Sequence, residues 1–188
     1  MRKLGIIFLA CTVCLGSVMA HDNTENSAVA SSYLKQAKRV EGQFVSLAKA
    51  IPQSKYNWRP MKGVRSIAEA FMHVALGNYI MLQTLGGTPP ATFDMKTYQT
   101  STTDRDKIIA EMQNSFSALN DFIAKIPESE YGQTVKFFGM DATKLDIIFV
   151  AATHEHETLG QAIAYARVNH IVPPWTAAEE AREKGAKK

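Results

Sequence analysis

Two histidines and two glutamates are concentrated in one short stretch, residues 153–161, of an otherwise apolar segment. On a helix surface, residues three and four apart are neighbours. A helix through this segment would therefore align the following polar side chains along one face: His154, Glu157, Thr158, Gln161 and Tyr165. Because polar groups are costly to bury unless they are paired or bound to something, this face is a candidate binding site.

A further histidine, His73, lies in another segment with helical spacing, where Ala70 and Gly77 leave room beside its ring. Helix bundles build metal sites in their core from one histidine on each of two helices and a carboxylate one turn away. Zinc, nickel, manganese or iron would accept two imidazoles and a carboxylate, with water completing the coordination shell. An open position on such a metal could polarise a substrate or activate water. We therefore predict His73 and His154 as metal ligands, and Glu157 as a ligand or general base.

The same residues allow a metal-free interpretation. A helix with two histidines and two glutamates can form a hydrogen-bonded interior or face solvent in part. His156 falls on a different face from His154, so we expect it to pack beside the site or to meet substrate rather than to bind metal. Glu155 is expected to be exposed or to cap a neighbouring element. Spacing alone does not choose between the two interpretations, because short clusters of this kind also arise without a metal.

Four segments show the apolar spacing of three and four residues that is typical of helices with one buried face. These segments cover residues 27–51, 66–85, 103–126 and 143–169. Their lengths and the unequal connections between them predict an all-α fold, a four-helix bundle. Residues after the Pro173-Pro174-Trp175 turn, about 176–184, are expected to add a short tail helix.

Three of the helix starts resemble N-terminal caps, in which a short side chain accepts a hydrogen bond from a free backbone N–H. The patterns are Ser66-x-x-Glu69, Thr103-x-x-Asp106 and Thr143-x-x-Asp146. Between the helices, residues 88–102 form a polar loop that is long enough to be a lid or rim. Residues 135–139 are predicted to be a short extended piece or hairpin.

Residues 1–20 have the pattern of a secretory signal, since Arg2 and Lys3 precede an apolar run and small residues precede a cleavage point after Ala20. Cleavage there would place the mature chain, residues 21–188, in the periplasm or outside the cell, with no stable membrane span. A lipoprotein attached at Cys11 is the second choice, because the apolar run before that cysteine would be unusually short.

Composition excludes several classes of function. Both cysteines, Cys11 and Cys14, lie in the signal, so the mature chain has no thiol nucleophile and no disulfide. The whole chain has 21 Lys and Arg against 18 Asp and Glu, and two of the basic residues lie in the signal. A nearly neutral mature chain gives no reason to expect a nucleic-acid partner. No Gly-x-Ser-x-Gly motif supports a serine nucleophile.

Two motifs resemble those of a known family. The first runs from Trp58-Arg59-Pro60 through residues 63–69 to His73-Val74-Ala75, and the second from His154-x-His156-Glu157 through residues 159–169 to Pro173-Pro174-Trp175. Together they resemble the paired metal motifs of the DinB-like (DinB/YfiT) superfamily, and the second is similar to that of secreted bacterial members. The resemblance covers about residues 28–176, which we take as the core of a single domain spanning residues 21–188.

This resemblance implies a four-helix bundle that holds a divalent metal with three histidines. Two of them correspond to His73 and His154, whereas the third corresponds to residue 158, which is Thr158 here. A threonine hydroxyl is a weak neutral ligand, so its presence should weaken metal binding unless Glu157 substitutes. His156 matches a common histidine of the family that is not the usual third ligand.

Two hypotheses follow from the resemblance. Characterised relatives include thiol-dependent transferases and isomerases, so the chain could be a metal-dependent hydrolase or transferase acting on a small molecule, with Gln161 and Tyr165 near the substrate. Alternatively, it could be a degenerate bundle that binds a small ligand or partner without metal and without catalysis, as Thr158 suggests. Formation of a homodimer through an exposed helix face is compatible with both hypotheses.

Overall fold

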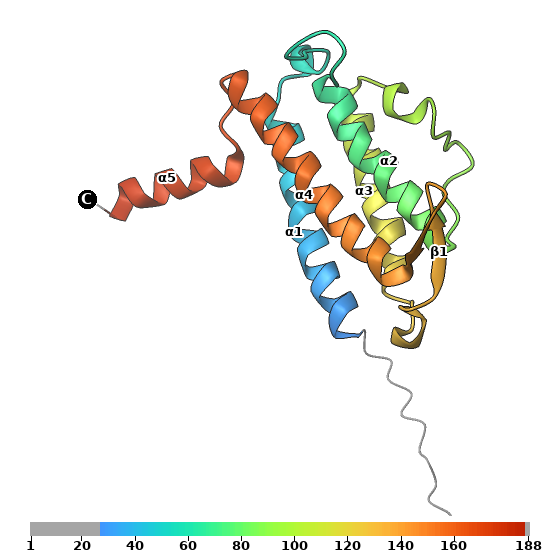
Figure 1. Ribbon diagram of the computed structural model, residues 1–188. Helices are drawn as coiled ribbons and strands as arrows, with labels where there is room; N and C mark the ends of the chain where they lie inside the picture. The colour runs from blue at the N-terminus through green and yellow to red at the C-terminus, as the bar shows by residue number, and fades with distance from the viewer. Residues whose placement is uncertain (1–26, 187–188) are drawn as a thin grey trace, which may run out of the picture.

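Four long helices pack side by side in the computed structural model, which describes residues 27–186 (Figure 1). They are α1 (Ala28–Ala50), α2 (Ile67–Leu85), α3 (Arg105–Ile123) and α4 (Lys144–Val168). Helix α2 contacts both α3 and α4, and α1 contacts the same two helices. This arrangement confirms the predicted all-α bundle.

The connections contain short elements, and a tail helix follows the bundle. These elements are η1 (Gln53–Lys55), η2 (Tyr98–Thr100), η3 (Glu128–Glu130), β1 (Thr134–Phe137), β2 (Met140–Thr143) and α5 (Pro174–Ala186). Strands β1 and β2 pair in an antiparallel hairpin, in which Phe137 lies opposite Met140. The two residues of its turn, Phe138 and Gly139, both have positive φ, as a tight hairpin turn requires. The predicted extended piece is therefore one strand and the turn of a hairpin.

Capping side chains fix the starts of the two helices that carry the candidate site. Ser66 and Glu69 form a complete capping box at the start of α2, and Thr143 and Asp146 form another at α4. The cap predicted at Thr103 is wrong by one residue. Asp104 caps α3 instead, because its carboxylate accepts from the backbone N–H of Lys107 at 2.9 Å.

The ends of α1, α2 and α4 lie within one residue of the predicted ends, and α3 is the exception. Helix α2 ends at Leu85 as predicted, since Gly86 adopts a φ of 104°, a conformation that glycine adopts without a steric penalty. Helix α3 ends at Ile123, before the predicted residue 126. The backbone N–H groups of Lys125 and Ile126 bond to carbonyls three residues earlier, so the last turn is tightened ahead of Pro127.

The core lies between the four helices and includes three phenylalanines, Phe44, Phe71 and Phe116, which are fully buried. Phe44 contacts both of the others through ring centroids 6.2 and 6.1 Å apart. Tyr56 covers one end of the core and donates a hydrogen bond to the carbonyl of Ala48. Most of α2 is buried, and one of its fully buried residues is the polar Asn78.

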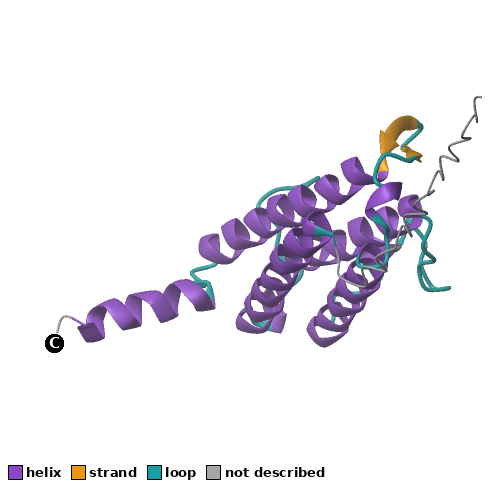
Figure 2. Cartoon of the chain, turned by 90° about the horizontal axis from the view of Figure 1, so that it is seen from below, coloured by secondary structure: helices purple, strands orange, loops and turns teal. Residues whose placement is uncertain are grey.

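Helix α5 extends away from the bundle in both ribbon views (Figures 1 and 2). It begins at Pro174, two residues before the predicted start, and none of its residues is buried. Within residues 27–186, no helix has the length and apolar character needed to cross a membrane. The predicted signal, its cleavage after Ala20 and the lipoprotein alternative at Cys11 all lie outside the described residues.

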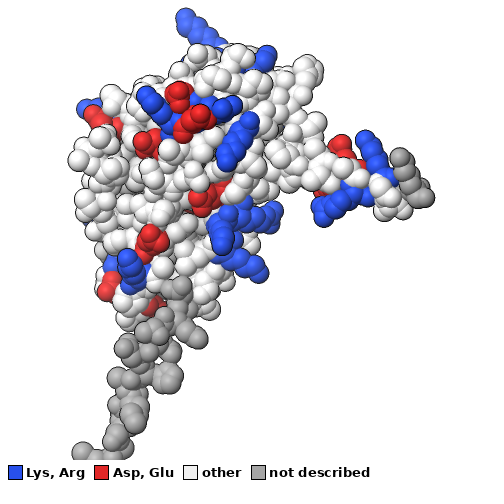
Figure 3. All heavy atoms as spheres, turned by 180° about the vertical axis from the view of Figure 1, so that it is seen from behind, with Lys and Arg blue, Asp and Glu red and all other residues white. Residues whose placement is uncertain are grey.

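Charged side chains of both signs are interspersed on the face that Figure 3 shows. Such mixing agrees with the nearly balanced charge of the sequence. Surfaces that bind nucleic acid instead gather Lys and Arg in a patch or stripe. The absence of a nucleic-acid partner stays a prediction.

Glu155 was expected to be exposed or to cap a neighbouring element, and the first alternative is wrong. Its side chain is only 1% exposed and lies between α4 and α1, where the Tyr33 hydroxyl donates a hydrogen bond to Oε1 at 2.9 Å. Oε2 is buried without a partner among the described residues. Burial raises the pKa of Glu155 to about 8, the Tyr33 bond opposes this, and the negative charge of Glu41 adds to it.

The raised pKa of Glu155 predicts that the protein loses stability as the pH rises. The folded protein holds this proton up to about pH 8, whereas the unfolded chain releases it near its ordinary value of about 4.5. The folded state therefore binds more protons in this window, and the free energy of unfolding should fall between about pH 5 and pH 9. The Glu155→Gln variant should remove this slope and be about 2–4 kcal/mol more stable than wild type at about pH 9.

Urea unfolding across this pH range measures the effect. Glu183→Gln, on the exposed helix α5, is the control that removes a carboxylate without touching the core. If wild type and Glu155→Gln keep the same difference in stability at every pH, Glu155 is not the group that titrates.

Candidate functional site

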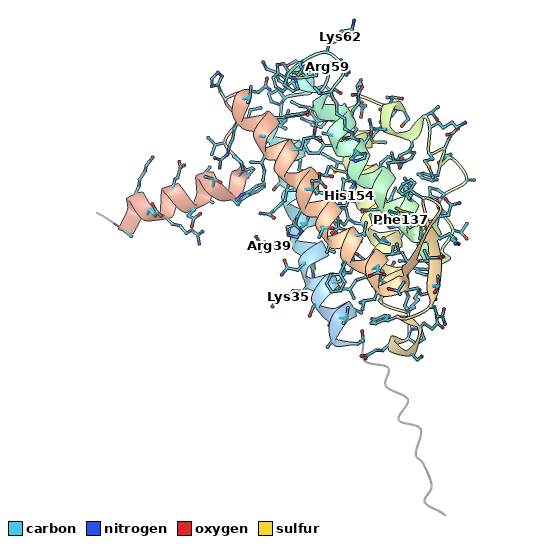
Figure 4. The ribbon with its side chains drawn as sticks, viewed as in Figure 1. Lys35, Arg39, Arg59, Lys62, Phe137 and His154 are labelled. Atoms are coloured by element: carbon cyan, nitrogen blue, oxygen red, sulfur yellow. The ribbon has the colours of Figure 1, made fainter. Side chains whose placement is uncertain are left out.

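His73 on α2 and His154 on α4 meet across the interface of the two helices. Their Nε2 atoms are 3.2 Å apart, and the ring centroids are 4.9 Å apart with planes inclined by 66°. His154 extends from α4 toward α2 (Figure 4). The structure thus brings together the two histidines that the sequence predicted as partners.

Gly77 makes this approach possible. It lies one turn after His73 on α2, and a Cβ atom added there would be 2.2 Å from Cε1 and 2.7 Å from Nδ1 of His154. Ring atoms cannot overlap a side chain in this way. The space expected beside His73 is therefore occupied by the second imidazole.

A small cavity of about 130 Å³ lies in front of the two rings. Its lining residues are Arg65, His73, His154, Glu157, Thr158 and Gln161. Thr158 is 4% exposed, whereas Glu157 is exposed and Gln161 is half-buried. All but Arg65 were predicted as site residues, and the structure gathers them around one cavity.

Two other predicted residues lie outside the cavity lining. Tyr165 is buried one turn beyond Gln161, and its hydroxyl accepts a hydrogen bond from Nε2 of Gln161 at 3.1 Å. The Tyr165 ring packs edge-on against Trp58, so it can hold Gln161 in place. His156 is exposed, and its Nδ1 lies 2.9 Å from the carbonyl of Ala152 in its own helix.

Burial favours the neutral form of both imidazoles. It lowers the pKa of His73 to about 4, and the charge of Arg65 and the charged form of His154 act in the same direction, whereas a hydrogen bond with the Gln99 side chain opposes them. Burial also lowers the pKa of His154, an effect that the carboxylate of Glu157 opposes and Arg65 strengthens. Neutral imidazole is the form that binds metal ions.

Arg65 is the residue of this cavity that the sequence analysis did not single out. It directly precedes Ser66, the N-cap of α2. It lies outside the helix, so helical spacing does not predict where its side chain points, and only its place next to the capping residue Ser66 links it to the start of α2.

The positions of the two Nε2 atoms fit a shared cation. Zinc binds imidazole nitrogen at about 2.0–2.1 Å, so two such nitrogens on a tetrahedral ion lie roughly 3.3 Å apart. The observed separation is 3.2 Å. A straight hydrogen bond of this length would place the ring centroids about 5.5 Å apart, but they are 4.9 Å apart. The two rings are therefore tilted relative to a straight hydrogen bond between the nitrogens.

Beyond these two imidazoles, the structure offers few further ligands for a metal ion. Among residues 27–186, no three His, Cys, Asp or Glu side chains are grouped so that they could hold a metal ion. The Nδ1 atoms of both rings are buried without a hydrogen-bonding partner in the described part of the chain, although metal-bound histidines usually donate from this second nitrogen. The residues fit a cation held by two imidazoles, with its other positions left to Glu157, Thr158 or water.

Fold and site together define the class of protein: a four-helix bundle with a polar histidine site between its second and fourth helices. The sequence matches the DinB superfamily over residues 36–162, which is more than half of the chain. The protein therefore belongs to the DinB superfamily, as its motifs indicated. Membership of a secreted branch stays a prediction.

Solved structures show the same fold at low sequence identity. A DinB-like protein from Bacillus cereus has a TM-score of 0.67 and 11% identity, with 77% of this chain and 95% of that chain covered. A DinB-like protein from Bacillus subtilis has a TM-score of 0.54 and 12% identity, with coverage of 76% and 92%. A conserved protein from Enterococcus faecalis has a TM-score of 0.59 and 12% identity, with coverage of 74% and 95%. No curated protein matches the sequence.

Replacing Gly77 with alanine tests the packing of His154. The added methyl group would overlap the His154 ring, so Gly77→Ala should lower the free energy of unfolding by about 1–3 kcal/mol, the usual cost of overpacking. It should also shift the ring NMR signals of His154. Urea unfolding and a histidine ring spectrum measure the two effects.

Gly42→Ala is the matched control, because nothing lies within 4 Å of a Cβ atom added at Gly42 in α1. This variant should gain about 0.5–1 kcal/mol, since alanine favours a helix over glycine. An equal gain in both variants would contradict the close approach of His154 to Gly77.

Proposed function

We propose that this member of the DinB superfamily is a metal-dependent enzyme, a hydrolase or transferase that acts on a small molecule in the periplasm or outside the cell. The observation that carries the proposal is the convergence of His73 and His154, whose Nε2 atoms are 3.2 Å apart at a polar cavity. The location rests on the signal-like pattern of residues 1–20.

Each residue around the cavity has a chemical part in the proposed enzyme. His73 and His154 would hold a divalent cation such as zinc, nickel, manganese or iron, with Glu157 or Thr158 as a weaker third contact. When bound, such an ion supplies Lewis-acid catalysis and lowers the pKa of water. The exposed carboxylate of Glu157, next to His154 on the cavity wall, can accept a proton from a substrate or a water molecule.

Gln161 would orient the substrate. Its side chain lines the cavity and donates from Nε2 to Tyr165, so its amide oxygen is left to accept a hydrogen bond. Because Tyr165 is itself packed against Trp58, the amide has a defined direction. A fixed acceptor of this kind favours substrates that present a donor at one position.

A metal-free binding protein is the second candidate. Thr158 at the expected third ligand position favours it, and so does Nδ1 of His154, which is buried without a partner among the described residues. In this case one neutral imidazole would donate directly to the other through Nε2, and the cavity would bind a small ligand without catalysis. A homodimer is compatible with either candidate.

Metal content separates the two candidates. The mature chain, purified without chelator and supplied with zinc, should hold about one metal ion per chain, because two imidazoles provide the main bonds. His73→Ala and His154→Ala should each lose this metal. Elemental analysis after gel filtration measures it.

His156→Ala removes an exposed histidine of the same helix and should keep the metal. Wild-type protein that stays metal-free under these conditions would rule out the metal-dependent proposal. Equal losses in all three variants would show that the metal binds elsewhere or nonspecifically.

Restoring a histidine at residue 158 measures what the threonine has changed. Thr158 lines the cavity one turn after His154, so Thr158→His should add a third imidazole and tighten zinc binding by more than about tenfold. Calorimetric titration with zinc provides the comparison, and Thr153→His, at an exposed position of α4, is the control.

The starting affinity decides between the candidates. If wild type binds no zinc and Thr158→His binds it, the metal-free candidate is correct. If wild type already binds tightly and the substitution changes little, the metal-free candidate is wrong and residue 158 is not a ligand position.

A further inference from the structure

Arg65 is a cation in the cavity without an anionic partner. Its Nε donates to Oε1 of Gln99 at 3.0 Å, and none of the ion pairs found in residues 27–186 includes it. Glu157 lines the same cavity but is not paired with it. Half-buried arginines usually bind a carboxylate or another acceptor, because an unpaired charge is costly away from water.

The backbone on both sides of Arg65 is held firmly. On one side, Nη1 of Arg59 donates to the carbonyl of Val64 at 2.8 Å, and Nη2 of Arg59 pairs with Glu69 at 2.9 Å. On the other side, Ser66 is locked in the capping box of α2. Figure 4 shows Arg59 at the end of the bundle where α2 begins. The side chain of Arg65 therefore extends into the cavity from a fixed position of the backbone.

The side chain of Arg65 is also held, by the loop that was predicted to be a lid or rim. Gln99 lies in η2, next to Tyr98, which is buried and donates to Glu111 at 2.5 Å. The Tyr98 ring packs edge-on against Tyr79 of α2. An anchored loop thus binds Nε of Arg65 and leaves the outer nitrogens of the guanidinium without a partner among the described residues.

The outer nitrogens of a guanidinium form a planar pair of donors that matches an oxyanion. The charge of Arg65 also reaches both imidazoles, since it lowers the pKa of His73 and of His154. A cavity of about 130 Å³ has room for one small charged group next to the rings. Its wall therefore combines one fixed cation with two neutral imidazoles.

We propose that Arg65, positioned by Gln99, binds an oxyanionic group of the substrate, either a carboxylate or a phosphate, beside His73 and His154. This inference rests on the proposed function in so far as it takes the cavity to be the substrate site. Anion binding, however, needs only Arg65 and Gln99, so it can be measured in protein that holds no metal.

In the test, metal is first removed from the mature chain, which is then titrated with sodium acetate and, separately, with sodium phosphate. Sodium chloride is adjusted at each step so that the ionic strength stays constant. The NMR signal of the Arg65 Nε–H group is followed in wild type, and the ring signals of His73 and His154, which line the same cavity, are followed in wild type and in every variant. At least one anion should shift these signals in a saturable manner, and Arg65→Gln should weaken binding by about tenfold or more, the worth of a charged hydrogen bond. Saturation with acetate alone identifies a carboxylate site, and saturation with phosphate alone identifies a phosphate site.

Three variants complete the design. Arg65→Lys keeps the charge but loses the planar fork, so part of the affinity should remain. Gln99→Leu should weaken binding severalfold by releasing Nε, while Arg39→Gln, at an exposed position of α1, should not change it. No saturable shift with either anion, or unchanged affinity in Arg65→Gln, would overturn the inference.

Metal content measured on parallel zinc-treated samples separates this inference from the proposed function. If zinc binds through His73 and His154 but Arg65→Gln leaves anion affinity unchanged, the proposed function stands and the inference is wrong. If no zinc binds but anion affinity depends on Arg65, the inference is supported and the metal-dependent proposal is wrong.

Discussion

The contact between His73 and His154 is the interaction on which the rest of the site depends. Two imidazoles can come within 3.2 Å only where two helices cross closely and one of them presents no side chain. Gly77 meets this condition. Because both rings are largely removed from water, their pKa values are lowered and they cannot both be charged. The pair can therefore share one proton or bind a cation, and both are useful chemistry for a buried polar site.

The starts of α2 and α4 are both held by capping boxes. Ser66 with Glu69 and Thr143 with Asp146 satisfy free backbone N–H groups of the first turns, which stabilises the two helices that carry the histidines. The box at Ser66 has a second effect, since it fixes the backbone next to Arg65. The residues that begin α2 therefore also hold the part of the cavity wall that Arg65 forms.

The sequence predicted those features that depend on local spacing. The helices, two capping boxes and the pairing of His73 with His154 all follow from residues close to one another along the chain or from a motif. Glu155 was misjudged because α4 has two buried faces, one against α2 and one against α1, whereas a single polar stripe suggested one. Its partner, Tyr33, is 122 residues away in sequence. Arg65 depends in the same way on Gln99, and no local pattern reveals either pairing.

The charges around the cavity suggest that its proposed ligands would bind together. Two neutral imidazoles would suit a cation, but Arg65 adds a positive charge that opposes a cation nearby. Glu157 offsets this only in part, because it is exposed and not paired with Arg65. An oxyanion on Arg65 would remove the repulsion, so each ligand should strengthen the binding of the other by the same factor. If both proposals hold, the two histidines and the adjacent arginine would therefore bind a metal ion and an anionic substrate more tightly together than either one alone.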